Sequence, residues 1–377
     1  MDIIYHHRIA SKDGQYVHIE AIYSALSRQG HSLRLVGPAL HEQSDFGHDG
    51  GIVSKLKSKL PKFVYELMEL GYSAVVAYKL IKEIRKTRPD AIYERYNLFQ
   101  PAGVMVANYF KIPLILEVNA PLKQERERFS GGLALPRLAK WIEDYTWKNA
   151  DKVLPVSDVL ADHCRQAGVS EGNIDVIHNG VTQSLIEKYQ NADTASKDVV
   201  TIGFVGFMHL TCGVEEAIEV LAEVGNPKVK LVCVGDGNVL ASLKEKAVSL
   251  GVEKQVSFPG LVSRKDVMSY VENFDIALQP AVTEYASPLK MFEYMVSKSL
   301  IVAPDMANLR EILTDDCAVF FDPDVKGSFK DALKSALEDV TLLSNRRQSA
   351  YNRLVDAGFS WDKNAERIVA HIEDLRS

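Results

Sequence analysis

Residues 287–295 read SPLKMFEYM and contain the side chains with the clearest chemical potential in the chain. Ser287 followed by Pro288 predicts the start of a helix, with the serine as the N-cap and the proline at the first helical position. The free amides of Leu289 and Lys290, together with the helix dipole, would then offer a site for an anion such as a diphosphate.

Two charged side chains on this predicted helix support a ligand site. Lys290 places a cation in the first turn, where it opposes the helix dipole, and an anionic ligand would explain that placement. Glu293 lies three residues further along on the same face, where its carboxylate could accept hydrogen bonds from ribose hydroxyls. The alternative is an ordinary amphipathic helix with two solvated charges.

Glycine-containing turns follow several predicted strands in the same half of the chain. The run Ile202–Val205 ends at Gly206, where the missing side chain permits close approach to a ligand, and the loop continues through His209. After another strand, the backbone near Val262 could pair with a base edge, and Arg264 follows it. Each turn alone is weak evidence, because such turns are common between strands and helices.

Polar side chains also mark the strand ends of the first half. His6, His7 and Arg8 follow the first predicted strand, Glu94 closes the third, and Glu117 and Asn119 flank the end of the fourth. The carboxyl ends of parallel strands meet at one edge, so these residues are candidates for contact with a second substrate. Glu117 has the chemistry to polarise a hydroxyl, although strand alternation could point it away from that edge. The alternative is that each is a structural group bonded to the backbone.

Composition narrows the class of protein. With 377 residues, 46% of them hydrophobic and 25% charged, the chain is long enough for two globular domains. A net charge of -6 argues against nucleic-acid binding, which needs a basic excess. The four cysteines have no CxxC or metal-ligand spacing, which is typical of reduced thiols in a cytoplasmic protein. We expect neither a signal peptide nor a membrane span, because no basic leader and no long apolar run is present.

Short β-branched runs alternate with helical patterns along the whole chain, which predicts two doubly wound α/β domains. We place these domains at residues 1–185 and 186–358, with a polar linker at Tyr189–Asp198 and a C-terminal helix, residues 359–377, that packs back on the first domain. A cleft is expected between the carboxyl edges of the two sheets. The predicted strands are Ile3–Tyr5, Leu33–Val36, Ala91–Glu94, Leu114–Val118, Lys152–Val156, Asp175–Ile177, Val199–Val205, Lys230–Val234, Gln255–Phe258, Ile276–Gln279, Leu300–Ala303 and Ala318–Phe320.

Five motifs, in the same order, resemble those of glycosyltransferase family 4. They are NIDVIHNGV at Asn173–Val181, GFVG at Gly203–Gly206, VGDG at Val234–Gly237, VSFPG at Val256–Gly260, and the segment Ser287–Met295. The match covers nearly the whole chain and is specific for fold rather than for substrate. It implies a retaining enzyme of the GT-B fold, in which two Rossmann-like domains face each other across a cleft.

The resemblance also implies roles for individual residues in donor binding. Glu293 matches the second glutamate of the family's E-x7-E motif and would hold the donor ribose, while the amides of Leu289 and Lys290 would contact the phosphates and Val262 would lie beside the base. Gly14 matches the glycine that lets the first domain approach the diphosphate. His18, in the same segment as Gly14, is a candidate on the acceptor side.

Three departures from the family pattern concern charge. The first glutamate of E-x7-E falls at Tyr285, with Glu284 one residue off, and the arginine and lysine that usually follow the Gly206 strand align with Phe207 and Cys212. The family's usual histidine aligns with Asn119, which can hydrogen-bond a sugar hydroxyl but cannot titrate. Losing two phosphate cations is costly unless another group replaces them. Our hypothesis is that Lys290 does so, helped by His209 or Arg264.

The implied activity is transfer of a sugar from a UDP- or GDP-linked donor to a sugar or lipid-linked hydroxyl acceptor, in surface polysaccharide or glycolipid synthesis. The candidate catalytic residues are Glu117, Asn119 and Lys290. We expect no cofactor beyond the nucleotide-sugar co-substrate and no metal, because Asp322–Asp324, formally a DxD, is interpreted as a turn. A sugar-nucleotide 2-epimerase and a non-catalytic GT-B binding protein remain alternatives. Dehydrogenase and P-loop motifs are absent from the sequence.

A basic stretch in the first half suggests contact with a membrane. Lys55, Lys57, Lys59 and Lys62 alternate with apolar residues, so a helix here could touch an anionic lipid surface at the inner face of a membrane. A solvated loop broken at Pro61 is the alternative. The sequence predicts no oligomeric state.

Overall fold

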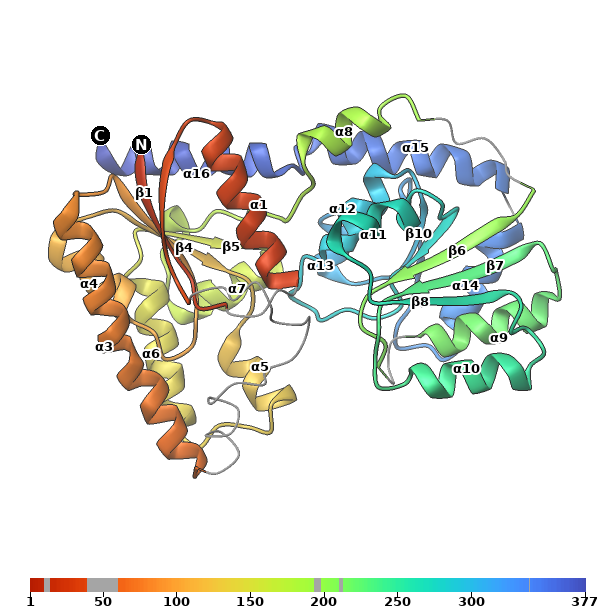
Figure 1. Ribbon diagram of the computed structural model, residues 1–377, viewed down its shortest axis with the longest axis horizontal. Coiled ribbons are helices and arrows are strands. Elements are labelled where there is room, and N and C mark those ends of the chain that lie inside the picture. Colours follow the sequence, from red (N-terminus) through yellow and green to blue (C-terminus); the bar gives the residue numbers. More distant parts are fainter. Residues whose placement is uncertain (10–13, 39–59, 193–197, 210–212, 339) are drawn as a thin grey trace. The chain divides into compact units, whose positions relative to one another are not determined.

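The protein is described by a computed structural model that covers residues 1–9, 14–38, 60–192, 198–209, 213–338 and 340–377. These residues form two compact units (Figure 1). Unit 1 comprises Met1–Asn179 and Trp361–Ser377, and unit 2 comprises Gly180–Ser360.

Unit 1 contains a five-stranded parallel sheet with the order β2-β1-β3-β4-β5. The strand order reverses between β1 and β3, and doubly wound sheets bind ligands outside the carboxyl ends of the strands at such a switch point. His6, at the end of β1, therefore pairs with Val36 on one side and Glu94 on the other. The strands are β1 (Asp2–His6), β2 (Ser32–Val36), β3 (Ala91–Arg95), β4 (Leu114–Val118) and β5 (Lys152–Pro155).

The helices of unit 1 begin and end where the local sequence allows. The Ser157 hydroxyl caps α7 by accepting a 3.1 Å hydrogen bond from the Leu160 amide, and Gly168 ends that helix in the left-handed conformation. The helices are α1 (Gly14–Arg28), α3 (Lys62–Lys86), α4 (Ala102–Phe110), α5 (Leu122–Phe129), α6 (Pro136–Lys148), α7 (Asp158–Ala167), the 3-10 turn η1 (Glu171–Asn173) and α16 (Trp361–Arg376).

The predicted strand Asp175–Ile177 does not form a regular strand. The segment runs beside β5, where the amides of Asp175 and Ile177 donate to the carbonyls of Val153 and Pro155. Between these two bonds, a parallel ladder would need an N–H group at position 155, and proline has none. The pairing is therefore incomplete, and the prediction of a sixth strand was wrong.

The C-terminal helix α16 packs on α1, which confirms that the end of the chain returns to the first domain (Figure 1). Arg28 forms an ion pair with Asp362 at 2.8 Å, and the His18 ring lies edge-on to the Trp361 ring, with centroids 4.9 Å apart. The Asn364 amide donates to the His178 carbonyl. These contacts join the two segments that make up unit 1.

Unit 2 contains a six-stranded parallel sheet with the order β11-β10-β9-β6-β7-β8. Its first strand lies at the centre, as in dinucleotide-binding sheets, and the switch point lies between β6 and β9. The strands are β6 (Val200–Val205), β7 (Val229–Val234), β8 (Val256–Gly260), β9 (Ile276–Leu278), β10 (Leu300–Pro304) and β11 (Ala318–Phe321).

Helices cover both faces of this sheet (Figure 1). An apolar cluster of buried side chains packs the helices against each face. One cluster lies under α9, α10 and α14, and the other under α11, α12 and α15. The helices are α8 (Gln183–Tyr189), α9 (Val214–Val224), α10 (Leu240–Ser249), α11 (Arg264–Val271), α12 (Leu289–Val296), α13 (Ala307–Arg310), α14 (Ser328–Glu338) and α15 (Val340–Asp356).

The chain passes between the units at residues 179–180 and 360–361, a few residues from the boundaries placed from sequence. Helix α8, beside the polar segment interpreted as a linker, belongs to unit 2, where the Tyr351 hydroxyl donates to the Ile186 carbonyl at 2.8 Å. Residues 193–197 of that segment lie outside the described residues.

Gly203, inside β6, is required by packing. A Cβ atom at this position would lie 2.1 Å from the Phe274 ring, which is buried in the core. We predict that Gly203→Ala lowers the free energy of unfolding by about 1–3 kcal/mol, the usual cost of overpacking. Gly71→Ala in α3, where a Cβ atom meets nothing within 4 Å, is the matched control and should be neutral or stabilising. Equal thermal midpoints for the two variants would contradict this prediction.

Candidate active-site residues

Helix α12 begins one residue later than predicted. Its N-cap is Pro288, with φ -70° and ψ 126°, and the buried Ser287 precedes that cap. Proline's fixed φ is compatible with a cap as well as with a first helical position. Leu289 and Lys290 are consequently the first two helical residues, whose N–H groups have no acceptor within the helix.

Two hydrogen-bonding groups position the start of α12. The Tyr294 hydroxyl accepts a 3.0 Å hydrogen bond from the Val205 amide, so the helix is attached to the end of the central strand β6. The buried Asn308 side chain donates to the carbonyls of Thr283 and Ala286 in the loop before the helix, at 3.0 and 2.7 Å. The helix N-terminus is thereby held at the carboxyl edge of the sheet.

Lys290 lies over the end of β6. Its ammonium nitrogen is 4.5 Å from the centre of the Phe204 ring, and a Cβ atom on Gly206 would lie 3.2 Å from the same nitrogen. The structure thus brings together two residues that the sequence assigned to donor binding. An ammonium beside a helix N-terminus and a glycine backbone is suited to an anionic ligand.

The glycine turns after β6 and β7 pack backbone against backbone. The Gly206 amide donates to the Val234 carbonyl at 3.0 Å, and the Gly235 amide donates to the Gly260 carbonyl at 2.9 Å. Gly235 has a φ of 135°, and a Cβ atom there would lie 2.0 Å from the Gly206 carbonyl oxygen. Glycine is therefore needed at this position for close contact between the turns as well as for its φ angle.

Glu293 is buried within unit 2, with only 2% of its surface exposed. Its carboxylate forms an ion pair with Arg264, the first residue of α11, whose side chain is 42% exposed. Val262 is half-buried and precedes α11, packed against the apolar cluster that contains α12. Three residues predicted to contact a nucleotide therefore lie on two adjoining elements.

The residues that replace charged residues of the family pattern differ in how exposed they are. Phe207 is 63% exposed, Tyr285 is buried and Glu284 is exposed, while Cys212 lies outside the described residues. Tyr285 therefore replaces a glutamate with a core residue, and its hydroxyl cannot supply the missing carboxylate charge. His209 is exposed.

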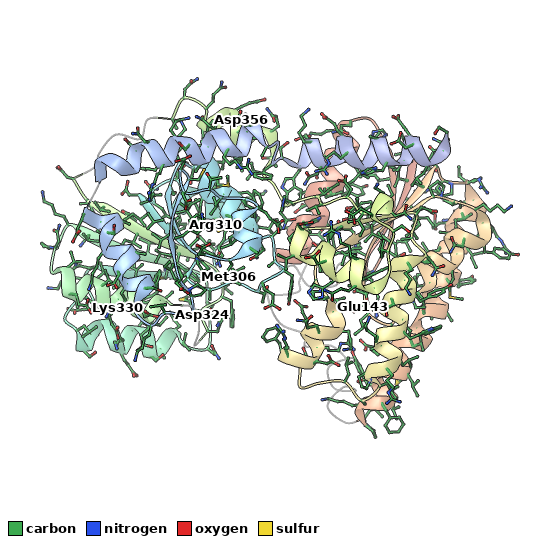
Figure 2. The ribbon with its side chains drawn as sticks, turned by 180° about the vertical axis from the view of Figure 1, so that it is seen from behind. Glu143, Met306, Arg310, Asp324, Lys330 and Asp356 are labelled. Atoms are coloured by element: carbon green, nitrogen blue, oxygen red, sulfur yellow. The ribbon has the colours of Figure 1, made fainter. Side chains whose placement is uncertain are left out.

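A hollow of about 1310 Å³ opens beside His209, Gly213 and residues 280–282 of unit 2. Met306, Asp324 and Lys330 also line it (Figure 2). The Asp324 amide donates to the Asp322 side chain at 2.9 Å, which confirms that the DPD segment is a turn. Within the described part of the chain, no group of three or more His, Cys, Asp or Glu side chains is arranged to hold a metal ion.

In unit 1, a buried carboxylate gathers four side chains at the ends of β3 and β4. Glu117 accepts hydrogen bonds from the Tyr93 hydroxyl and the Arg95 guanidinium, both at 2.5 Å, and from the Asn119 amide. The Nε2 atom of His18, on α1, lies 2.9 Å from the same carboxylate. Asn119 and His18, both predicted site residues, are thus fixed by Glu117.

Burial by itself would raise the pKa of Glu117. The charges of His18 and Arg95, and hydrogen bonds from His18 and Tyr93, outweigh that effect and hold the pKa of this carboxyl well below its usual range. Both carboxylate oxygens have donors, and a carboxylate with so low a pKa is a weak proton acceptor. The structure therefore makes Glu117 a positioning residue and not the group that polarises an acceptor hydroxyl.

The three other residues expected on the acceptor side are buried. His6, His7 and Glu94 are each exposed by 2% or less. The His6 Nδ1 atom lies 3.3 Å from Glu94 Oε2, and a Cβ atom on Gly103 would overlap that carboxylate. The pKa of His7 is lowered to about 4 by burial and by the neighbouring charge of His6, so His7 is neutral at physiological pH. The expectation of acceptor contact is corrected for these three, because interior packing occupies them.

Gly14 is the first residue of α1, and residues 10–13 before it lie outside the described residues. Its position at the N-terminus of a helix is compatible with the phosphate contact expected from the resemblance. His18 lies one turn further along the same helix.

Sequence reasoning missed the carboxylate of Glu143, which lies in α6 within unit 1 (Figure 2). Its Oε2 atom accepts hydrogen bonds from the Tyr96 hydroxyl at 3.0 Å and the Lys123 amide at 3.2 Å. Helix α5 begins after Pro121, which provides no side-chain cap, so Glu143 supplies one from another helix. The local signal was the uncapped start of α5, but nothing local indicated which distant residue would cap it.

Two family models match consecutive parts of the chain. The glycosyl transferase 4-like domain matches residues 13–180, and the glycosyl transferases group 1 model matches residues 186–353. The chain therefore belongs to the family 4-like glycosyltransferases of the GT-B fold, which use nucleotide-sugar donors.

One curated relative and two solved structures illustrate this membership. The α-monoglucosyldiacylglycerol synthase of Streptococcus pneumoniae (strain ATCC BAA-255 / R6) is 23% identical over 247 residues, which cover 61% of this chain but only 56% of that enzyme. The fold is similar to that of a glycosyltransferase from Rickettsia africae ESF-5, with a TM-score of 0.72 and 15% identity over 100% of this chain and 98% of that one. It is also similar to Anabaena Alr3699/HepE in complex with UDP, with a TM-score of 0.70 and 18% identity over 98% of this chain and 100% of that one.

Burial raises the pKa of Glu143 to about 7, more than its hydrogen bonds from Lys123 and Tyr96 lower it. A carboxyl whose pKa is raised on folding stabilises the protein at low pH, and that contribution is lost as the pH rises through 7. Glu143→Gln cannot ionise. We therefore compare the free energy of unfolding of Glu143→Gln with that of the wild type. We predict that this difference shifts in favour of the variant by roughly 2 kcal/mol between pH 5.5 and pH 8, because only the wild type loses stability over this range.

Thermal or denaturant unfolding at the two pH values measures this effect. Glu366→Gln, which alters an exposed carboxylate of α16 paired with Lys363, is the control, and its stability relative to the wild type should change little between the two pH values. A constant difference between Glu143→Gln and the wild type at both pH values would show that Glu143 does not titrate in this range.

Proposed function

We propose that this glycosyltransferase binds the diphosphate of its donor at the N-terminus of α12 and moves the sugar to a hydroxyl acceptor. The observation that carries this proposal is the placement of Lys290 beside Gly206, next to the first amides of α12. Helix dipole, backbone N–H groups and ammonium together offset the charge that the departing diphosphate develops. Lys290 would thus replace the family's arginine and lysine, with Arg264 or His209 as helpers.

Glu293 would hold the ribose of the donor. Its carboxylate is acceptor-only when ionised and can receive hydrogen bonds from two sugar hydroxyls. Val262, two residues before the start of α11, would lie beside the base. We propose that the nucleotide of the donor is UDP, because the structurally similar HepE was solved in complex with UDP. GDP is the alternative.

We further propose that transfer occurs with retention of configuration and without a metal ion. The acceptor oxygen would form a bond to the anomeric carbon while the bond to the phosphate oxygen breaks, and the acceptor proton would pass to the leaving diphosphate. This route needs no protein base, which agrees with the occupied, low-pKa carboxylate of Glu117. Asn119 donates its amide N–H to Glu117, and its side-chain oxygen would accept a hydrogen bond from an acceptor hydroxyl. Activity that collapses in EDTA would contradict the metal-free route.

Exposed Phe207 and buried Tyr285, in place of charged residues, favour a second candidate, a non-catalytic protein that binds a nucleotide or glycan. A sugar-nucleotide 2-epimerase would act without an acceptor. Release of free nucleoside diphosphate separates the three. A transferase releases it rapidly only when an acceptor is added, an epimerase does so without one, and a binding protein does not release it.

For the acceptor we propose a surface polysaccharide or glycolipid precursor, with the enzyme lying on the inner face of a membrane. The curated relative is a diacylglycerol glycolipid synthase. At the start of α3, the side chains of Phe63, Leu67 and Met68 are 48–50% exposed, and Lys62 adjoins them. Exposed apolar side chains beside a cation are suited to an anionic lipid surface. Lys55, Lys57 and Lys59 lie outside the described residues, and no described helix is long and apolar enough to span a bilayer.

Lys290→Ala tests the donor site. We expect the Kd for UDP to rise by about tenfold to a hundredfold, the usual effect of losing a charge-assisted contact, and Lys290→Arg to retain part of the affinity. Isothermal titration calorimetry measures this effect, and Lys265→Ala, an exposed lysine on α11, is the control. A UDP affinity unchanged in Lys290→Ala would remove the central element of the proposal.

Phe63→Ser combined with Leu67→Ser tests membrane contact, since both residues lie on one face of α3. We expect the wild type to sediment with vesicles that contain anionic lipid, and the double variant to lose most of that binding. Tyr109→Ser, which alters an exposed aromatic residue of α4, is the control. Binding that ignores the anionic lipid content, or persists in the double variant, would contradict the proposal.

A further inference from the structure

A small cavity in unit 1 lies at the carboxyl ends of β1 and β3, the two strands that flank the switch point of the sheet. Its volume is about 300 Å³. Arg8 follows β1, Asn97 and Leu98 follow β3, and Leu122 and Glu125 reach the cavity from α5. That volume is at the lower end of the range for ligand pockets, so the cavity suits a group of about one sugar ring.

One wall of the cavity is closed by an ion pair. Arg126, on α5, binds the carboxylate of Glu69, on α3, through both terminal nitrogens, at 2.5 and 3.0 Å. The bidentate geometry satisfies both carboxylate oxygens. The same guanidinium lies over the Phe99 ring, with its carbon 5.6 Å from the ring centre. The charges of Arg126 and Glu69 therefore compensate each other.

Arg8 is held differently. Its guanidinium lies over the Tyr72 ring, 4.9 Å from the ring centre, and it has no carboxylate partner among the residues that the structure describes. A guanidinium held over an aromatic ring by a cation–π contact still has its N–H groups available as hydrogen-bond donors. That edge matches the two oxygens of a carboxylate or a phosphate. The cavity therefore contains a positioned anion-binding group whose charge no described acid neutralises.

The remaining lining suits a sugar. Asn97 donates its amide nitrogen to the Arg95 carbonyl at 3.0 Å, which fixes its side chain and leaves its oxygen as an acceptor for a hydroxyl. The Glu125 carboxylate is a further hydroxyl acceptor. Leu98 and Leu122 supply apolar surface against which the C–H groups of a sugar ring can pack.

We infer that this cavity binds the acceptor and that the acceptor is a sugar carrying an anionic group, a carboxylate or a phosphate, which pairs with Arg8. The inference rests on the proposed function only in taking the bound sugar to be the acceptor. Arg8 is the specificity-determining residue, because an uncharged sugar would leave its guanidinium without a counter-charge.

Ligand-observed NMR titration with defined sugars tests the inference in the absence of any nucleotide. The probes are glucuronic acid, glucose 6-phosphate, uncharged methyl glucoside and inorganic phosphate. We expect at least one of the two acidic sugars to bind the wild type about tenfold or more tightly than methyl glucoside and inorganic phosphate, as one charge-assisted contact provides. The two acidic sugars distinguish a carboxylate from a phosphate.

Variants assign the effect to Arg8. Arg8→Ala should bind the acidic sugars no better than methyl glucoside, and Arg8→Lys should retain part of the preference because it keeps the charge but not the paired N–H groups. Arg85→Ala, an exposed arginine on α3, should behave as the wild type. A thermal shift with UDP shows that each variant is folded.

Three results would overturn the inference. They are equal affinity for acidic and uncharged sugars, an acidic-sugar affinity that is unchanged in Arg8→Ala, and inorganic phosphate binding as tightly as the acidic sugars, which would indicate an anion site only. Because no nucleotide is present, these failures leave the donor proposal intact. If Lys290→Ala loses UDP binding but sugar binding does not depend on Arg8, only the inference is refuted. If the wild type itself does not bind UDP, the proposed function is refuted.

Discussion

The hydrogen bond from the Val205 amide to the Tyr294 hydroxyl fixes α12 against the end of β6, and the proposed donor site depends on this contact. It attaches α12 to the central strand of the second sheet, so the N-terminus of the helix and the glycine turn after β6 occupy the same edge. The location of Lys290 over Phe204 follows from that attachment. A helix dipole acts over about one turn, so an anion site of this kind needs such fixed placement.

Unit 1 depends on a different constraint, the compensation of buried carboxylates. Glu117 has four side-chain partners, Glu143 has two hydrogen-bond donors, and Glu66 accepts the amides of Ala134 and Leu135 at 2.7 and 2.8 Å. A buried charge is tolerated only when donors satisfy it. The partners of each carboxylate come from elements that are distant in sequence. The contacts that compensate the buried carboxylates therefore also hold these elements together.

The sequence was sufficient for the fold because the signals of a doubly wound sheet are local. β-branched runs, helix periodicity and glycine turns each lie within a few residues, and the five family motifs added their order. The exceptions have specific causes. Pro155 removes the ladder bond that a strand at Asp175–Ile177 needs, and the fixed φ of Pro288 is compatible with a cap. Neither effect is visible from hydrophobic pattern alone.

The candidate site was less predictable because its chemistry depends on partners from other elements. Strand-end position correctly located His6 and Glu94 at the edge of the sheet, but both side chains are buried, and the Glu94 carboxylate packs against Gly103 of α4. The hydrogen bonds that occupy the Glu117 carboxylate come from Tyr93, Arg95 and His18. The spacing of these residues in the sequence does not indicate that they meet at one carboxylate. Lys290 and Glu293 were more accessible to prediction because their positions are defined within one helix.

The path of the chain has a consequence for how the protein is made. Unit 2 is an insertion within unit 1, because the chain leaves unit 1 at Asn179 and returns only at Trp361. Synthesis proceeds from the N-terminus, so unit 2 can fold on the ribosome as soon as its residues emerge. The face of α1 that packs against α16 must wait until residues 361–376 have been synthesised. The half of the enzyme that is synthesised first is thus the last to be completed.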